Sequence, residues 1–276
     1  MNNYYLDTEF IEGSQKKKLL GITIGKTKPT IDLISIAIVA EDGREYYAVS
    51  KDFNLNEAWN RYDLKSTTLP MPPIKVYWIR ENVLKNIWLD LEYKKFIKSN
   101  FKLSYRCKSN SNTINSIVSK LITLKVKGFV KREVYYSFLK RNVSMTKARL
   151  RKLINEFGLP NEVIGKQVKE FCTKNGSPVF YADYCNYDWV VLCWLYGKMI
   201  DLPSEFPYYC NDLQQIFNTK IDEYLANSKK KNIETAREEY LRSLKDLASY
   251  PRNNMEHNAL SDARYDKELH KFLKHV

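Results

Sequence analysis

Residues 3–11, NYYLDTEFI, form an apolar segment that nevertheless carries two carboxylates, Asp7 and Glu9. The β-branched and aromatic content of this segment is typical of a buried strand, which normally excludes unpaired charge. Side chains alternate between the two faces of a strand, so Asp7 and Glu9 point the same way, about 7 Å apart. The segment predicts either a strand whose polar face meets solvent or a basic residue, or a strand that holds a divalent metal ion.

The 276 residues are enough for one substantial core, or for a core with a small second module. The longest uninterrupted apolar run, Trp189 to Tyr196, is far shorter than the ~18–20 residues of a membrane span. Asp7 arrives before an apolar signal segment could form, and the five cysteines contain no CxxC pair. These features predict a reduced, cytoplasmic protein without a membrane contact, a disulfide framework or a zinc knuckle.

The net charge of +13 is concentrated in one segment of the chain. Residues 99–160 hold 14 Lys and Arg against two acids, so this segment supplies +12 of the total and the remainder supplies only +1. Such asymmetry points to a polyanionic partner, most simply nucleic acid.

Periodicity within the same segment predicts three short amphipathic helices. Their apolar faces are expected to be Ile114, Ile117, Val118, Leu121 and Ile122; then Val134, Phe138 and Leu139; then Leu150, Leu153, Ile154 and Phe157. Ser144 is a candidate cap for the third helix, and the tight link resembles a helix-turn-helix module. The basic side chains that fall off the third stripe are candidate nucleic-acid contacts: Lys147, Arg149, Arg151 and Lys152. The alternative is an insertion whose lysines only keep it soluble.

Apolar runs between turn signals predict the remaining elements. Strands are expected at 4–11, 18–25, 31–40, 44–50, 177–183 and 207–210, and helices at 80–98, 188–197, 212–226 and 259–274. Asp42-Gly43 predicts a hairpin turn, and the 18–25 run fits an extra hairpin arm. Residues 227–239 are expected to be exposed helix or linker.

Further candidate site residues lie downstream. Asp188 begins an apolar helix, where a carboxylate also suits the helix dipole, and Asp183 is the competing acid at the preceding strand end. His257 precedes the terminal helix, and Asp262 follows it by five residues. Each of these residues alone has an adequate structural explanation.

Taken in order, these residues resemble the three motifs of the DEDDh 3'–5' exonucleases: Asp7-x-Glu9, Tyr187-Asp188 and His257-x4-Asp262. Longer stretches are similar to the small mycobacterial-type bacterial exoribonucleases, namely DTEFIEG, LISIAIVAEDGREYYAVS, WIRENVL, YDWVVLCWLYG and HNALSDAR. The resemblance covers residues 1–98 and 178–276, and it selects Asp188 over Asp183. Tyr184 departs from the family pattern, which often has Asn there, and DTEFIEG departs from the common DTETTG.

The resemblance implies a ribonuclease-H-like α/β fold, with a mixed sheet whose first strand is central and with helices on both faces. The exonuclease domain would comprise residues 1–98 and 161–276, and residues 99–160 would be an inserted all-α module that binds nucleic acid. A homodimer is implied by the resemblance alone.

The chemistry expected of the site is two-metal phosphodiester hydrolysis, in which two ions about 3.5–4 Å apart serve the attacking and leaving oxygens. Asp7, Glu9, Asp188 and Asp262 carry −4 in total, which two Mg²⁺ or Mn²⁺ ions balance. Without metal, mutual repulsion is expected to raise the pKa values of these carboxylates.

His257 is the candidate general base, because a neutral imidazole can take a proton from the attacking water. Thr8 and Phe10 are candidate contacts to the terminal nucleotide, although core packing explains Phe10 equally well. The predicted activity is release of nucleoside 5'-monophosphates from RNA 3' ends. The alternatives are a DNA exonuclease with the same chemistry, and a non-catalytic nucleic-acid-binding protein on a nuclease scaffold.

Overall fold

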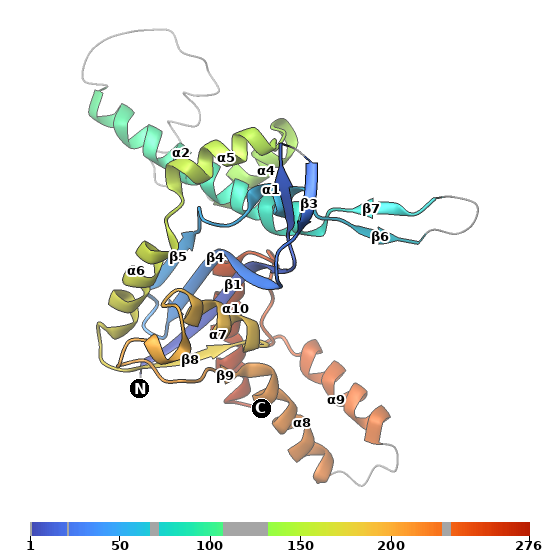
Figure 1. Cartoon of the computed structure of the whole chain (residues 1–276). Coiled ribbons are helices and arrows are strands. Elements are labelled where there is room, and N and C mark those ends of the chain that lie inside the picture. Colours follow the sequence, from blue (N-terminus) through green and yellow to red (C-terminus); the bar gives the residue numbers. More distant parts are fainter. Residues whose placement is uncertain (1, 21, 67–71, 107–131, 228–232) are drawn as a thin grey trace.

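The computed structural model describes residues 2–20, 22–66, 72–106, 132–227 and 233–276. Its centre is a five-stranded mixed sheet in the order β5-β4-β1-β8-β9 (Figure 1). The strands of this sheet are β1 Asn2–Gly13, β4 Thr30–Ala40, β5 Glu45–Val49, β8 Pro178–Ala182 and β9 Asn211–Asp212. The prediction of an α/β fold of the ribonuclease-H-like kind, with β1 central in a mixed sheet flanked by helices, is confirmed.

β1 runs antiparallel to β4 and parallel to β8, and the hairpin predicted at Asp42-Gly43 joins β4 to β5. Gly43 has a φ of 89°, a conformation that glycine adopts without steric cost. The strand expected at 207–210 is wrong, because pairing with β8 begins only at Asn211. The apolar run that suggested a strand contains Tyr208 and Tyr209, which are exposed.

Alternation along β1 sends successive side chains to opposite layers. Tyr4 and Leu6 pack against α6 (Asn161–Thr173) and α7 (Asn186–Trp194), whereas Tyr5 packs against α10 (Ala259–Leu273). α6 was not predicted from the sequence, and its buried residues Ile164 and Val168 cover the sheet. α8 (Leu213–Ala226) and α9 (Ile233–Asp246) share a separate apolar cluster with the end of α10.

Within the basic segment 99–160, residues 99–106 form the end of α2 (Lys85–Arg106) and residues 132–160 are also described, whereas the helix expected at 114–122 lies outside the described residues. α4 (Arg132–Asn142) and α5 (Lys147–Phe157) follow, and the stripe predicted for α5 is buried as expected. The stripe predicted for α4 is wrong in part, because Val134 and Phe138 are 59% and 48% exposed while Tyr136 is buried with Leu139. Thr146, not Ser144, caps α5 by accepting a hydrogen bond from the backbone N–H of Arg149 at 3.2 Å.

α4 and α5 share one apolar cluster with α1 (Leu55–Asn60) and α2 (Lys85–Arg106), which follows a π-helical turn at Arg80–Leu84. The buried residues of this cluster include Trp88 from α2, Leu139 from α4 and Leu150 from α5. The described part of the basic segment is therefore packed on the same core as residues 83–91, and a separate module at 99–160 stays a prediction.

Two hairpins project from this body (Figure 1). The first, β2 (Lys16–Leu19) with β3 (Ile22–Lys26), confirms the arm expected at 18–25. The second, β6 (Asp63–Lys65) with β7 (Ile74–Val76), was not predicted, because three-residue strands leave too short a pattern to recognise. Within the described ranges, no helix combines the length and the apolar character that a membrane span requires.

Candidate active site

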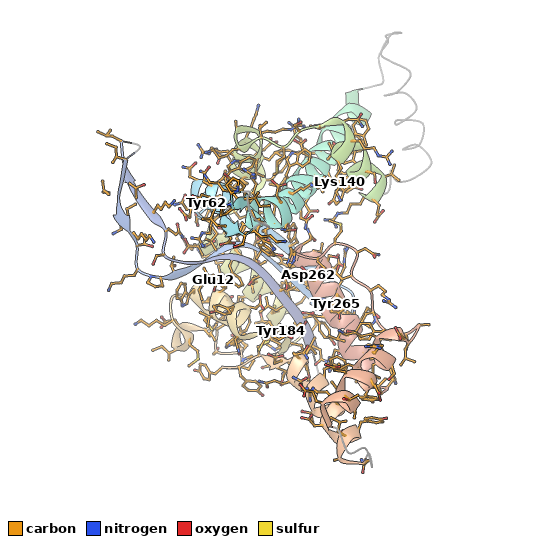
Figure 2. All side chains as sticks on the ribbon, turned by 90° about the vertical axis from the view of Figure 1, so that its right-hand side faces the viewer. Glu12, Tyr62, Lys140, Tyr184, Asp262 and Tyr265 are labelled. Carbon is orange, nitrogen blue, oxygen red and sulfur yellow. The ribbon has the colours of Figure 1, made fainter. Side chains whose placement is uncertain are left out.

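A cavity of about 1210 Å³ lies beside β1, between the start of α7 and the first turns of α10. Figure 2 shows Glu12, Tyr184, Asp262 and Tyr265, four of its lining residues, gathered along this strand. Nine carboxylates line the cavity: Asp7, Glu9, Glu12, Asp63, Asp183, Asp188, Glu256, Asp262 and Asp266. Only two guanidinium groups, those of Arg61 and Arg252, accompany them among the described residues. The cavity is therefore strongly acidic although the chain as a whole is basic.

Three of the four predicted metal ligands converge closely. Alternation along β1 places Asp7 and Glu9 on the face of Tyr5, which is the face that α10 covers. Asp262 lies in the first turn of α10, and one carboxylate oxygen from each of the three acids lies within 4.8 Å of the others. These three acids from two distant segments could hold one hard cation between them.

Asp188 reaches the same cavity from the opposite face of the sheet. It lies in the first turn of α7, and its Oδ1 accepts hydrogen bonds from the backbone N–H of Thr8 at 2.8 Å and from Thr8 Oγ1 at 2.6 Å. Asp188 is not part of the group of three acids, because Thr8 points toward α7 while its neighbours point toward α10. The hydroxyl of Thr8 is engaged by Asp188, so its predicted contact to the terminal nucleotide would use other atoms.

Burial raises the pKa of all four predicted metal ligands. The pKa values of Asp7 and Glu9 lie well above the ordinary range, first because of burial and then because of neighbouring carboxylates. Burial raises the pKa of Asp188 to about 7 against the two hydrogen bonds from Thr8, and that of Asp262 to about 6. The predicted direction is correct, but burial exceeds the mutual repulsion that the sequence analysis invoked.

Asp183 and Asp266 form a second acidic pair in the cavity. Asp266 Oδ2 accepts a hydrogen bond from the backbone N–H of Asp183 at 3.2 Å, and burial raises the pKa of both carboxyl groups, that of Asp183 to about 6. Asp266 was not among the predicted site residues, although its position four residues after Asp262 on a helix places both on one face. Asp183 and Asp188 were the two candidates for the middle acid of the site. Of these two, only Asp188 hydrogen-bonds to β1, through Thr8.

His257 lines the cavity from the loop that precedes α10. The residue is half-buried with a φ of 62°, and its ring meets that of Trp78 at a centroid distance of 4.6 Å. Asn86 Nδ2 donates a hydrogen bond to the carbonyl oxygen of His257 at 3.0 Å. α2 therefore holds the backbone of this loop in place.

A second contact from α2 secures the neighbouring residue. Asn258 caps α10 by accepting from the N–H of Ser261 at 3.1 Å, and its Nδ2 donates to Asp90 Oδ2 at 2.7 Å. Asp90 in turn pairs with Arg132 and accepts from the hydroxyl of Tyr136, both on α4. The links to Asp90 have no sequence signal, because they join segments more than 40 residues apart.

Phe10 faces the cavity together with Tyr187. Their rings stack at a centroid distance of 5.5 Å and an interplanar angle of 21°. The β1–β4 register shifts between Glu9 and Phe10, and such bulges often redirect a side chain. Phe10 also packs against the apolar cluster that includes α7. The structure is therefore compatible with both a nucleotide contact and core packing for this residue.

The four basic candidates on α5 lie apart from the residues that line the described cavity. Arg149 pairs with Glu92 of α2, and Arg151 donates to Asn56 Oδ1 at 2.8 Å. Lys147 is half-buried and Lys152 is exposed. Their contact with nucleic acid stays a prediction.

The fold and the cavity define an α/β protein whose buried carboxylates fit a divalent cation. Among curated proteins, the chain is 40% identical over 91 residues to a 3'-5' exoribonuclease of Mycobacterium tuberculosis strain H37Rv, and equally to that of strain CDC 1551 / Oshkosh. The match takes in 32% of this chain and 43% of each relative, so the chain matches less than half the length of these proteins. No family model matches the sequence.

Proposed function

We propose that this protein is a metal-dependent 3'–5' exoribonuclease that releases nucleoside 5'-monophosphates from RNA 3' ends. The observation that carries this proposal is the meeting of Asp7, Glu9 and Asp262 within 4.8 Å, in a cavity that Asp188 and His257 also line. The partial match to mycobacterial proteins named 3'-5' exoribonucleases supports the direction of attack and the choice of RNA.

The residues present fit divalent cations. Buried carboxylates repel one another when they are ionised. The nine carboxylates that line the cavity would also repel the phosphates of an RNA end. Mg²⁺ or Mn²⁺ would offset both repulsions, with Asp7, Glu9 and Asp262 as ligands of one ion and Asp188 completing a site for two.

When bound, the two ions supply an activated water and stabilise the charge on the leaving oxygen. His257 takes the proton of the attacking water, because its ring lines the cavity on a loop that is joined directly to α10. Phe10 and Tyr187 offer a stacked aromatic surface to the terminal base.

Digestion of an RNA duplex with a 3' overhang, beside its DNA counterpart, tests the proposal. With Mn²⁺ we expect the RNA to shorten stepwise from its 3' end and to yield mononucleotides, whereas chelation with EDTA stops the reaction. Products cut internally, or intact RNA with either Mg²⁺ or Mn²⁺, would reject it. Faster digestion of the DNA strand would establish the DNA alternative instead.

The hydrogen bond from Asn86 predicts a positioning role for this residue. In Asn86→Ala the loop of His257 loses a contact to its backbone, so we expect kcat to fall by about 10–100-fold, as when a partner that orients a site residue is lost. The matched control is Asn142→Ala, because Asn142 also donates to a backbone carbonyl, that of Phe138 at 2.8 Å, but on α4. Equal kcat values in the two variants would contradict this role, provided that stabilisation by Mn²⁺ is the same in both.

A further inference from the structure

Aromatic and cationic side chains form one continuous series of contacts at the base of the β6–β7 hairpin. Lys75 Nζ lies 4.5 Å from the ring centroid of Tyr62, whose ring lies 5.7 Å from that of Tyr77. The guanidinium of Arg80 covers Tyr77 at 3.8 Å and Trp59 at 5.6 Å. We call Trp59, Tyr62, Lys75, Tyr77 and Arg80 the hairpin stack.

The hairpin stack adjoins the acidic cavity. Arg61 and Asp63, on either side of Tyr62, line the cavity, and so does Trp78, which follows Tyr77. Figure 2 shows Tyr62 above Glu12, another lining residue near the end of β1. A nucleic-acid strand that leaves the cavity on this side would pass directly over the stack.

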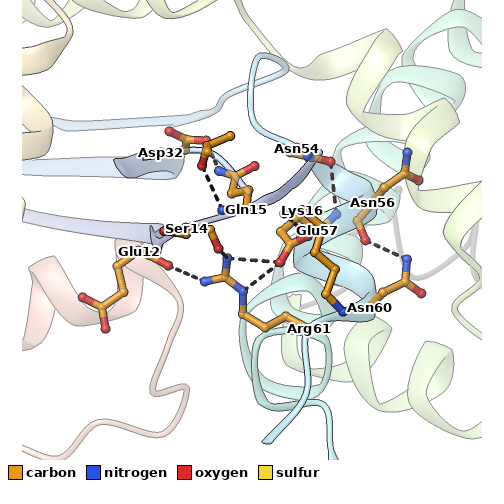
Figure 3. Close-up of polar contacts among 11 residues, drawn as sticks. Glu12, Ser14, Gln15, Lys16, Asp32, Asn54, Asn56, Glu57, Asn60 and Arg61 are labelled. Atoms are coloured by element: carbon orange, nitrogen blue, oxygen red, sulfur yellow. Dashed lines mark hydrogen bonds and ion pairs between the residues drawn. The ribbon is translucent and has the colours of Figure 1, made fainter. Parts of the chain in front are cut away.

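Arg61 fixes the base of the hairpin to β1 (Figure 3). Its guanidinium donates to the carbonyl oxygens of Glu12 and Ser14, and it pairs with Glu57 of α1 at 3.2 Å. The stack is thus presented on an anchored platform beside the site, and a surface that is already ordered loses little conformational freedom when it binds a ligand.

The chemistry of the stack suits a single strand of nucleic acid. Every base has a π-face that can stack on an aromatic ring, and lysine and arginine neutralise the phosphates between the bases. Tyr62 is 38% exposed, so part of its surface is accessible to a base. Trp78, which adjoins the stack, is 43% exposed. The cavity is acidic and the stack beside it is cationic, which matches a metal-filled site followed by a path for the phosphate backbone.

We propose that the hairpin stack binds the single-stranded RNA segment immediately upstream of the 3'-terminal nucleotide. This inference rests on the proposed function for the position of the 3' end. It assigns the recognition of upstream nucleotides to the hairpin stack and not to the basic residues of α5.

Tyr62→Ala, Tyr62→Phe and Lys75→Ala test the inference in the full chain. For single-stranded RNA of about 12 nucleotides, we expect Tyr62→Ala to weaken binding about 10-fold, as loss of one base stack does, and Tyr62→Phe to restore it. Lys75→Ala should reduce the slope of log K against log salt concentration by about 1, which corresponds to the loss of one phosphate contact. Binding is measured by fluorescence anisotropy in chains that also carry Asp7→Asn, so that the RNA stays intact.

Tyr224→Ala is the matched control, because Tyr224 is 41% exposed and stacks on a second tyrosine, Tyr240, but on α8 away from the cavity. In chains with Asp7 intact, Tyr62→Ala should lower, by about 10-fold, the ratio of kcat/KM for the longer RNA to kcat/KM for the p-nitrophenyl ester of a nucleoside 5'-monophosphate, which has no upstream nucleotide. Equal losses on both substrates, or binding as tight as in Tyr224→Ala, would overturn the inference. If the protein with Asp7 intact hydrolyses no RNA, weaker RNA binding by Tyr62→Ala would keep the strand-binding surface and reject only the exonuclease.

Discussion

The Asp7→Asn protein is expected to fold and to hydrolyse no RNA at a measurable rate. Asparagine keeps the shape of the side chain but removes the charge of a residue whose oxygen lies within 4.8 Å of those of Glu9 and Asp262. Loss of a residue that only orients a metal ligand lowers activity by about 10–100-fold. Loss of a ligand itself should therefore lower activity by more than about 100-fold. The measurement is the rate of mononucleotide release with saturating Mn²⁺.

Asp32→Asn is a suitable control for this variant. Asp32 lies on the neighbouring strand, opposite Ile11 in the register, and its carboxylate accepts a hydrogen bond from Thr30 outside the cavity. The Asp32→Asn protein should therefore keep its activity. Near-normal hydrolysis by Asp7→Asn would remove the proposed mechanism, whereas loss of activity in both variants would point to a general disturbance of the sheet.

Mn²⁺ should stabilise the protein strongly at about pH 7.5 and weakly at about pH 5. In the folded protein the pKa values of Asp188 and Asp262 are raised to about 7 and about 6, so the folded state retains protons that the unfolded chain has already lost. Without metal, the free energy of unfolding therefore falls by about 1.4 kcal/mol per pH unit for each group as the pH rises from about 4 to that group's folded-state pKa, about 6 for Asp262 and about 7 for Asp188. A cation that binds the ionised carboxylates reverses this loss.

Thermal unfolding with Mn²⁺ or EDTA at the two pH values measures the effect. At a concentration 100 times the Kd, a bound ion adds about 2.7 kcal/mol, which corresponds to roughly 5–10 °C for a chain of this size. The Asp7→Asn protein should lose most of the increase in Tm with Mn²⁺ and should be more stable than wild type in EDTA, because one repulsive charge is gone. An increase of the same size at both pH values would mean that the ion binds elsewhere.

The elements that position the site were predictable because each has a strong local pattern. β1 and α10 have clear periodicity, and the order of their acids and histidine is read directly from the chain. The side chain that secures Asp188 is Thr8, on the opposite face of β1 from Asp7. The face that each residue takes follows from the alternation of a strand, but the hydrogen bond itself depends on a packing of α7 that no local pattern contains.

The charge of the basic segment was harder to interpret from the sequence. A count of lysines and arginines treats every one as free, but Arg132 and Arg149 pair with Asp90 and Glu92, two buried acids of α2. A buried acid without such a partner is costly, so these two arginines are needed by the core. The pairs join segments that are far apart in the chain, and only the packing of α4 and α5 on α2 reveals them.

The alternation within β1 also limits how this protein can change in length during evolution. A single residue inserted into the strand ahead of Asp7 would turn the acids toward α7 and would turn Thr8 toward α10, as any one-residue slip of a strand does. Loops at the hairpin tips can lengthen without this penalty. Insertions and deletions should therefore accumulate in the two arms and in the basic segment, while the distance from the start of β1 to Glu9 stays constant.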